Sequence, residues 1–175
     1  TLFVPIVVAQ WLFFPYITSK AIVFRVLVEV AFAAWAGLLL LKARAYYPSR
    51  NTVMWAMGAF LVALVISTIT GIDPYHSFWS NFERMEGVIT HLHLFAFFLV
   101  LTSIFKTKRE WFWFLTTSVA VSVFVTGFGL LEYFEKIRTL NEGRIFSTLG
   151  NPIYLAGYLL FHLLLLGWLF MRSRN

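Results

Sequence analysis

Residues 141–158 hold the side chains best suited to binding an anion. They read Asn-Glu-Gly-Arg-Ile-Phe-Ser-Thr-Leu-Gly-Asn-Pro-Ile-Tyr-Leu-Ala-Gly-Tyr. Pro152 fits the first turn of a helix, where its missing N–H costs nothing, and Asn151 is a natural N-cap. The free amides and positive dipole end of that helix attract negative charge, and Arg144 lies a short loop away. This arrangement suits a phosphate or diphosphate. A cap beside a snorkelling arginine is the alternative.

Three other cations are candidates for the same anion. Arg25 and Glu29 are four residues apart, so on a helix they share a face. They form either an internal ion pair with Arg25 snorkelling, or Arg25 lines an anion site. Lys20 and Arg84 lie near the same predicted end of the molecule. We therefore predict that substrate contacts come from Arg144, Asn151, Arg84, Arg25 and Lys20.

The histidines do not form a metal site by spacing. His91 and His93 are two residues apart, so on a helix they point to nearly opposite sides and are expected to make separate hydrogen bonds. His162 lies within an apolar run, where a neutral histidine bonded to a neighbouring helix is the main expectation. The sequence has no cysteine, no HExxH, no GxSxG and no phosphate-binding glycine loop. No metal or cofactor is predicted.

The elements that must position these residues are transmembrane helices. Hydrophobic residues make up 60% of the chain and charged residues 13%, against about 25% charged in soluble domains. A soluble fold has no means of burying so much apolar surface, so lipid is the expected solvent. We predict an all-α, polytopic transmembrane helix bundle of about six spans, forming a single domain over residues 1–175. The predicted spans are 2–14, 21–41, 52–70, 88–105, 111–131 and 153–170, the first truncated because the chain is read as an excerpt.

The positive charges indicate orientation rather than nucleic-acid binding. Lys and Arg gather in the connection 42–51, in 106–110 and at the C-terminus, which predicts that these parts are cytoplasmic. In the connections 71–87 and 132–152 acidic residues balance the basic ones, and both are expected outside. Apolar residues at helical spacing within 77–87 predict a short amphipathic helix in the membrane interface. Small residues at four-residue spacing predict close helix packing; they are Ala33, Gly37, Ala59, Ala63 and Ser67.

The segment from Arg144 to Tyr158 resembles the signature of the O-antigen ligase/polymerase superfamily of bacterial membrane glycosyltransferases. That signature has an arginine, a glycine shortly after it, an Asn-Pro pair and a small residue in the next helix. Ile153 stands where the family usually has a second Asn. Residues 14–20, Phe-Pro-Tyr-Ile-Thr-Ser-Lys, and 79–87, Trp-Ser-Asn-Phe-Glu-Arg-Met-Glu-Gly, also fit the family.

The resemblance implies a function at the outer face of the bacterial inner membrane. Family members transfer a glycan from a polyprenyl diphosphate to an acceptor, which is lipid A core, a growing glycan or a protein, without metal or nucleotide sugar. Arg144 matches an arginine that holds the diphosphate. The family's catalytic histidine lies in a large external loop expected after Asn175, so no base is assigned. A transporter or flippase of anionic lipid-linked substrates and a non-catalytic envelope scaffold are the alternatives.

Overall fold

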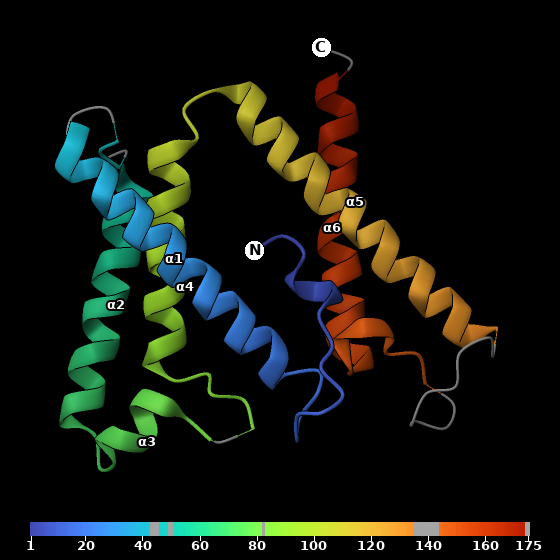
Figure 1. Ribbon diagram of the computed structural model, residues 1–175, viewed down its shortest axis with the longest axis horizontal. Coiled ribbons are helices and arrows are strands. Elements are labelled where there is room, and N and C mark those ends of the chain that lie inside the picture. Colours follow the sequence, from blue (N-terminus) through green and yellow to red (C-terminus); the bar gives the residue numbers. More distant parts are fainter. Residues whose placement is uncertain (43–45, 49–50, 82, 135–143, 174–175) are drawn as a thin grey trace. The chain divides into compact units, whose positions relative to one another are not determined.

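The computed structural model describes residues 1–42, 46–48, 51–81, 83–134 and 144–173 (Figure 1). These ranges fold into helices and contain no strand. In chain order the elements are η1 (Val4–Ile6), α1 (Thr18–Lys42), α2 (Thr52–Thr70), α3 (Pro74–Trp79), α4 (Val88–Ile104), α5 (Lys108–Tyr133), η2 (Ser147–Leu149) and α6 (Pro152–Ser173).

The predicted fold class is confirmed. Helices α1, α2, α5 and α6 are each long and apolar enough to cross a membrane, and α4 is a shorter apolar helix. Large apolar side chains cover the outside of these helices, among them Phe60, Ile66, Phe161 and Leu163, each more than half exposed. An apolar exterior of this extent is stable in a bilayer rather than in water.

The chain divides into two compact units. One comprises Thr1–Lys20 and Thr107–Asn175, and the other comprises Ala21–Lys106. In the first unit, which we call the α5–α6 unit, η1 and η2 both pack against α5, and α5 packs along α6 (Figure 1). In the second, the α2–α4 unit, α2 packs against α4, and α3 contacts both.

Local signals explain where the helices begin. The side chain of Asn51 accepts the N–H of Met54 at 2.8 Å and caps α2. A capping box between Thr107 and Glu110 starts α5 at Lys108, three residues before the predicted start. The predicted start was late because the span was begun after the charged residues, at the edge of the apolar run, whereas the cap lies before them. The predicted span 52–70 matches α2, and the remaining spans from 21–41 onward differ from their helices by a few residues at the ends.

The first predicted span is wrong. Residues 2–14 form only the short 3₁₀ helix η1 followed by turns. Pro5 occupies the first turn of η1, and Pro15 follows the predicted span. A proline donates no backbone N–H, so neither Pro5 nor Pro15 can make the hydrogen bond of a continuous α-helix through these positions. The apolar helices among the described residues therefore number five, not six.

The short helix in the connection 71–87 exists, but it lies earlier than predicted. α3 covers Pro74–Trp79 and is capped by the side chain of Asp73. It ends where Ser80 takes a positive φ of 64°, which an α-helix does not accommodate. The chain then returns past α3, since a Cβ at Gly87 would lie 2.1 Å from the carbonyl oxygen of Phe78. Phe82, which the pattern placed on the apolar face, lies outside the described residues.

The small-residue stripes do not form helix contacts among the described residues. Ala33, Ala59, Ala63 and Ser67 are exposed, and a Cβ at Gly37 would meet no atom within 4 Å. Close approach occurs at other glycines. Gly58 of α2 lies beside Phe95 of α4, and Gly129 of α5 lies beside Ile145 and Ser147. Spacing alone therefore identified small residues but not the face that packs.

Candidate functional site

A buried carboxylate holds the start of the loop that follows Arg144. Glu132, in the last turn of α5, is 8% exposed. Its Oε2 accepts the backbone N–H groups of Phe146 at 3.2 Å and Ser147 at 2.7 Å. The Ser147 hydroxyl donates to the carbonyl oxygen of Val125 at 2.6 Å. The Glu132 side chain and the Val125 carbonyl group of α5 therefore fix two consecutive loop residues, including Ser147 at its positive φ of 50°.

A lysine holds the middle of the same loop. The ammonium of Lys20 donates to the carbonyl oxygens of Val7 at 2.8 Å, Tyr16 at 3.0 Å and Thr148 at 2.6 Å. An ammonium has three N–H donors, and all three are used here. Lys20 was predicted to contact substrate. Here it ties the N-terminal segment to η2, and its predicted contact with substrate remains a prediction.

Tyr16 packs against both ends of η2. Its ring meets that of Phe146 edge to face, with centroids 5.6 Å apart. Gly150 has a φ of 73°, and a Cβ added there would lie 2.4 Å from Cβ and Cγ of Tyr16. Only glycine fits this close approach without displacement. Burial raises the pKa of the Tyr16 hydroxyl, and the nearby Glu132 carboxylate raises this pKa further.

The start of α6 is built as the sequence predicts. Pro152 is its first residue, and the side chain of Asn151 accepts the N–H of Ile153 at 2.8 Å. The carbonyl oxygen of Asn151 accepts the N–H of Leu155 at 3.0 Å, the first bond of the helix. Asn151 is thus a helix cap. Its predicted contact with substrate remains a prediction.

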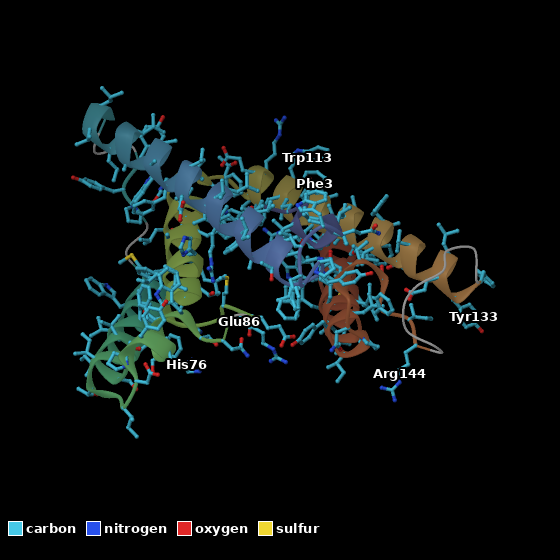
Figure 2. The ribbon with its side chains drawn as sticks, turned by 60° about the horizontal axis from the view of Figure 1, so that its bottom comes forward. Phe3, His76, Glu86, Trp113, Tyr133 and Arg144 are labelled. Atoms are coloured by element: carbon cyan, nitrogen blue, oxygen red, sulfur yellow. The ribbon has the colours of Figure 1, made fainter. Side chains whose placement is uncertain are left out.

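Arg144 is the first described residue of this loop. Its side chain is exposed and makes no hydrogen bond or ion pair with the described residues (Figure 2). Residues 135–143, which belong to the predicted outer connection, lie outside the described residues. The guanidinium is thus unbonded among the described residues, while Phe146, Ser147 and Thr148 after it are held in place.

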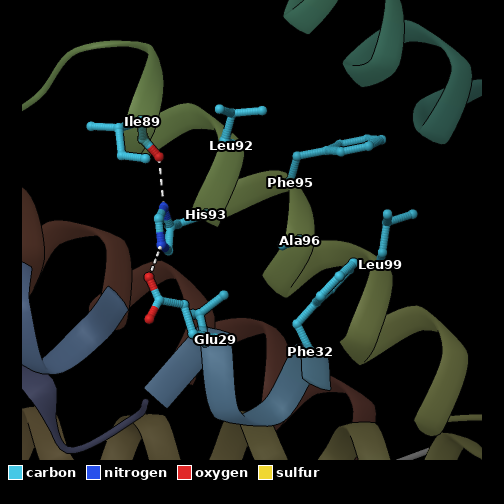
Figure 3. Close-up of a pocket in the computed structure, with 9 residues that line it drawn as sticks. Glu29, Phe32, Ile89, Leu92, His93, Phe95, Ala96 and Leu99 are labelled. Atoms are coloured by element: carbon cyan, nitrogen blue, oxygen red, sulfur yellow. Dashed lines mark hydrogen bonds and ion pairs between the residues drawn. The ribbon is translucent and has the colours of Figure 1, made fainter. Parts of the chain in front are cut away.

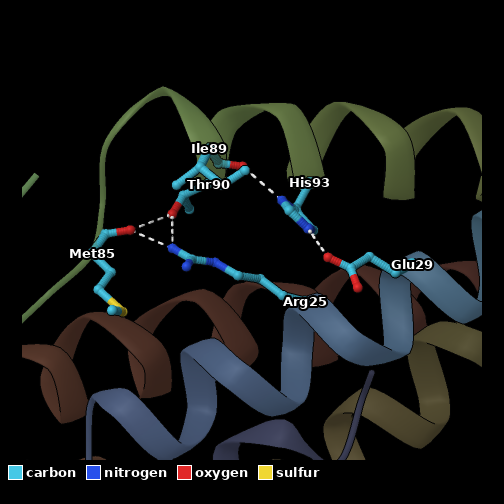
Figure 4. A network of polar contacts seen from close by, with 6 residues as sticks. All are labelled: Arg25, Glu29, Met85, Ile89, Thr90 and His93. Carbon is cyan, nitrogen blue, oxygen red and sulfur yellow. Dashed lines mark hydrogen bonds and ion pairs between the residues drawn. The ribbon is translucent and has the colours of Figure 1, made fainter. Parts of the chain in front are cut away.

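The other predicted cations belong to the α2–α4 unit. Arg25 donates through Nη2 to the carbonyl oxygen of Met85 and to Oγ1 of Thr90, the second at 2.9 Å (Figure 4). Thr90 in turn donates to the carbonyl oxygen of Met85 at 2.9 Å. Arg84, the residue before Met85, is exposed and has no side-chain partner among the described residues. Arg25 thus joins α1 to the start of α4.

Glu29 pairs with a histidine rather than with Arg25. Its Oε1 lies 3.0 Å from Nε2 of His93, and Nδ1 of His93 lies 2.7 Å from the carbonyl oxygen of Ile89 (Figure 4). The predicted ion pair between Arg25 and Glu29 is therefore wrong. The two residues do share a face of α1, as predicted, but each reaches its own partner near the start of α4.

A pocket opens beside this pair. It has a volume of about 540 Å³, and seven of its nine lining residues are apolar, including Phe32, Phe95 and Leu99 (Figure 3). Glu29 and His93 provide the two ionisable groups of its wall. Nothing in the sequence pattern predicted this pocket, because it depends on which faces of α1 and α4 meet.

The remaining histidines bear out the hydrogen-bonding expectation. His91 Nδ1 lies 3.2 Å from the carbonyl oxygen of Gly87. The buried His162 places Nδ1 2.8 Å from the carbonyl oxygen of Tyr158, and its Nε2 lies 3.0 Å from Oγ of Ser118 on α5. Nδ1 donates to this carbonyl oxygen, which only accepts, and the serine hydroxyl pairs with Nε2. His162 thus links α6 to α5, as predicted.

Sequence reasoning did not find the residues that support the loop. Glu132 was counted as a charge of the outer connection, and Tyr16 was not singled out. A signal was present for Glu132, since an acid in the last turn of an apolar helix is costly unless hydrogen-bonded. Tyr16 gave no such signal, because its role depends on the close approach of Gly150.

No family model, curated protein or solved structure matches this chain, so the resemblance rests on the residues quoted for it.

Proposed function

We propose that this chain is part of a membrane glycosyltransferase that transfers an oligo- or polysaccharide from a polyprenyl diphosphate to an acceptor. The acceptor is lipid A core, a growing glycan or a protein. The reaction takes place at the outer face of the bacterial inner membrane. Arg144 holds the diphosphate, and no metal takes part.

The observation that carries this proposal is the contrast between Arg144 and the loop after it. Arg144 is exposed and unbonded among the described residues. Phe146, Ser147 and Thr148 are buried and held by the charged groups of Glu132 and Lys20. A cation whose supporting loop is fixed in advance binds an anion without the entropic cost of ordering that loop.

The chemistry needs a stabilised leaving group. The acceptor oxygen or nitrogen forms a bond to the anomeric carbon of the glycan, while the bond from that carbon to the diphosphate oxygen breaks. Negative charge then grows on the diphosphate, and a guanidinium donating two hydrogen bonds stabilises it. The acceptor's proton passes to a base that we do not assign.

Binding of undecaprenyl diphosphate tests the proposal. Native mass spectrometry of the purified protein, with undecaprenol as the comparison lipid, measures whether the diphosphate is required. Removing a charge-assisted hydrogen-bonding group costs about 1.5–3 kcal/mol, so Arg144→Ala should weaken binding by about 10-fold or more. Arg144→Lys should also bind weakly, because lysine lacks the bidentate fork.

Arg172→Ala is the matched control. Arg172 is an exposed arginine in the last turn of α6, and its guanidinium lies over the Trp168 ring. This variant should bind undecaprenyl diphosphate as the wild type does. Equal affinity in Arg144→Ala and wild type would remove Arg144 from the site. Equal binding of undecaprenol and its diphosphate would end the proposal.

Cysteine labelling tests the proposed orientation. The chain has no native cysteine, so single cysteines report unambiguously. Ile72 in the connection 71–87 and Tyr47 in the connection 42–51 are both well exposed. A membrane-impermeant maleimide added to intact spheroplasts should label Ile72→Cys and not Tyr47→Cys. The reverse result would place Arg144 on the cytoplasmic side.

A further inference from the structure

The contact between His93 and Glu29 contains a proton that its geometry requires. A backbone carbonyl only accepts hydrogen bonds, so the Nδ1 of His93 that faces Ile89 O at 2.7 Å must carry hydrogen. The other ring nitrogen faces Oε1 of Glu29 at 3.0 Å. One more proton must lie between these two atoms, since an imidazole lone pair and a carboxylate repel each other.

This proton has two possible positions, and the net charge of the pair is the same in both. On the ring, it makes an imidazolium beside a carboxylate. On Glu29, it makes a neutral imidazole beside a carboxylic acid. Either way the pair is neutral overall, which suits a position inside apolar helices. Loss of the proton leaves a net negative charge and converts the hydrogen bond into a repulsion between α1 and α4.

Few other charged groups face the pair. Arg25 lies one turn away on α1, with Nη2 bonded to Met85 O and Thr90 Oγ1. His91 on α4 is bonded to Gly87 O, and its ring meets that of Phe60 on α2. Helix α2 contains no ionisable residue, and α3 contributes Tyr75 and His76, both exposed. Glu83, Arg84 and Glu86 lie on the segment leading into α4.

The pair is both anchored and accessible. The side chain of His93 is 10% exposed, and that of Glu29 is 65% exposed and lines the 540 Å³ pocket (Figure 3). His93 is the sixth residue of α4, so it lies only about 8 Å along the helix from the helix start. A proton therefore has a route to one partner while the other is held by the backbone.

We propose that Glu29 and His93 form a proton-binding site that closes the contact between α1 and α4 at the pocket wall. With the proton bound, the two side chains bond and the helices stay together at this level. When the proton leaves, the contact opens and the pocket widens. This site does not rest on the proposed glycan transfer.

Nitrogen NMR of histidine measures the proton directly. In protein labelled with ¹⁵N-histidine, difference spectra against His93→Gln assign the two ring nitrogens of His93. Nδ1 should be protonated throughout, and Nε2 should show the shift of a protonated or strongly hydrogen-bonded nitrogen. That Nε2 signal should move on raising the pH. A His93 ring with hydrogen on Nε2 and none on Nδ1 would overturn the proposal.

Spin labels on the two helices measure the opening. Cysteines at the exposed positions Val30 on α1 and Leu94 on α4 accept labels, and the chain offers no competing thiol. In the otherwise unchanged protein, the distance between labels should lengthen as pH rises across the transition seen by NMR. An unchanged distance across that transition would overturn the proposal.

Two variants separate this site from other titrating groups. In Glu29→Gln the amide can donate through its N–H to Nε2 of the neutral ring or accept through its oxygen from the protonated ring, so the contact persists in both states and the opening at high pH should be lost. In His91→Gln, two residues from His93 and without a carboxylate partner, the response should remain. A full response in Glu29→Gln, or its loss in His91→Gln, would refute the assignment.

Discussion

The α5–α6 unit and the α2–α4 unit use the same kinds of charged residue in different ways. In the first, Glu132 and Lys20 bond to backbone N–H and carbonyl groups of residues 146–148. In the second, Glu29 bonds to the side chain of His93, and Arg25 bonds to Thr90 and Met85 O beside a pocket. The first set fixes the path of the chain, and the second joins two helices through contacts made by side chains.

The difference teaches what a charge inside an apolar bundle does. When a charged side chain that bonds to the backbone is removed, no rotamer change of another side chain replaces it. The buried N–H or carbonyl groups then remain unpaired. A contact between two side chains can open, since each can turn toward water or lipid headgroups. Substitutions in the loop supports should therefore lower stability more than substitutions in the contact between α1 and α4.

Removing Glu132 should have the largest effect. Glu132→Ala leaves the N–H groups of Phe146 and Ser147 without their shared acceptor inside the protein. Each hydrogen bond to a charged group contributes about 1.5–3 kcal/mol, so we expect a loss of about 4 kcal/mol in the free energy of unfolding in mixed micelles. Amide hydrogen exchange should rise at Phe146 and Ser147.

The exposed Glu86 provides the control for this substitution. Glu86→Ala should change the free energy of unfolding by less than about 0.5 kcal/mol. If Glu132→Ala were as mild as Glu86→Ala, the carboxylate would not be holding the loop. Fast exchange at Phe146 and Ser147 in the wild type would lead to the same conclusion.

Gly150 tests whether the loop path itself is fixed. Gly150→Ala adds a methyl group 2.4 Å from Cβ and Cγ of Tyr16, at a φ of 73° that alanine adopts poorly. The positive φ costs alanine about 1–2 kcal/mol, and overpacking against Tyr16 adds about 1–3 kcal/mol. We therefore expect a loss of about 3 kcal/mol in the free energy of unfolding. Thermal unfolding in detergent measures it.

Gly157→Ala is the matched substitution in α6. A Cβ there meets no atom within 4 Å, so alanine should raise stability by about 0.5–1 kcal/mol through its higher helix propensity. Opposite signs at Gly150 and Gly157 are the expected result. Equal effects would mean that the loop adapts freely around Tyr16.

Lys20 should rank next. Lys20→Met keeps the length of the side chain but leaves the carbonyl oxygens of Val7, Tyr16 and Thr148 without their donor. These three bonds are only part-buried, whereas those of Glu132 are buried, so water can replace part of what is lost. We therefore expect a loss of about 2 kcal/mol in the free energy of unfolding, and faster proteolysis of the N-terminal segment. Lys108→Met, at an exposed lysine in the first turn of α5, should be neutral. Similar behaviour of the two variants would show that Lys20 does not hold the loop.

The sequence predicted the helices better than the contacts of their charged residues. Apolar length predicted the five apolar helices, and the predicted cap Asn151 agreed with the structure. The span 2–14 failed because hydropathy counts apolar residues and does not register the effect of Pro5 on the backbone. The pairing of Glu29 with His93 was missed because spacing relates residues on one helix, while this pair joins two.

The same limit applies to the candidate site. The order of residues 144–152 predicted a capped helix after an arginine, and that part is observed. The loop is held by Lys20, which bonds to Thr148, and by Glu132, which bonds to Ser147. Neither pair is adjacent in sequence, and each forms only after folding. Charge type predicted that Lys20 faces an anion. Geometry shows it donating to three carbonyl groups instead.

The smallest expected effect on stability is in the contact between α1 and α4, and it tests the difference between the two units from the α2–α4 unit. Thr90→Val removes the hydroxyl that accepts from Arg25 and donates to Met85 O, but it keeps the shape of the side chain. Arg25 retains its bond to the Met85 carbonyl, so the contact weakens without leaving a buried charge. Hydrogen bonds between membrane helices average about 0.6 kcal/mol, and we expect a loss of that size.

Thr70→Val, which removes only a bond to Ile66 O within α2, should cost less. A loss from Thr90→Val as large as that from Glu132→Ala would show that the α1–α4 contact is as rigid as the loop, and that the two units do not differ in the way we describe.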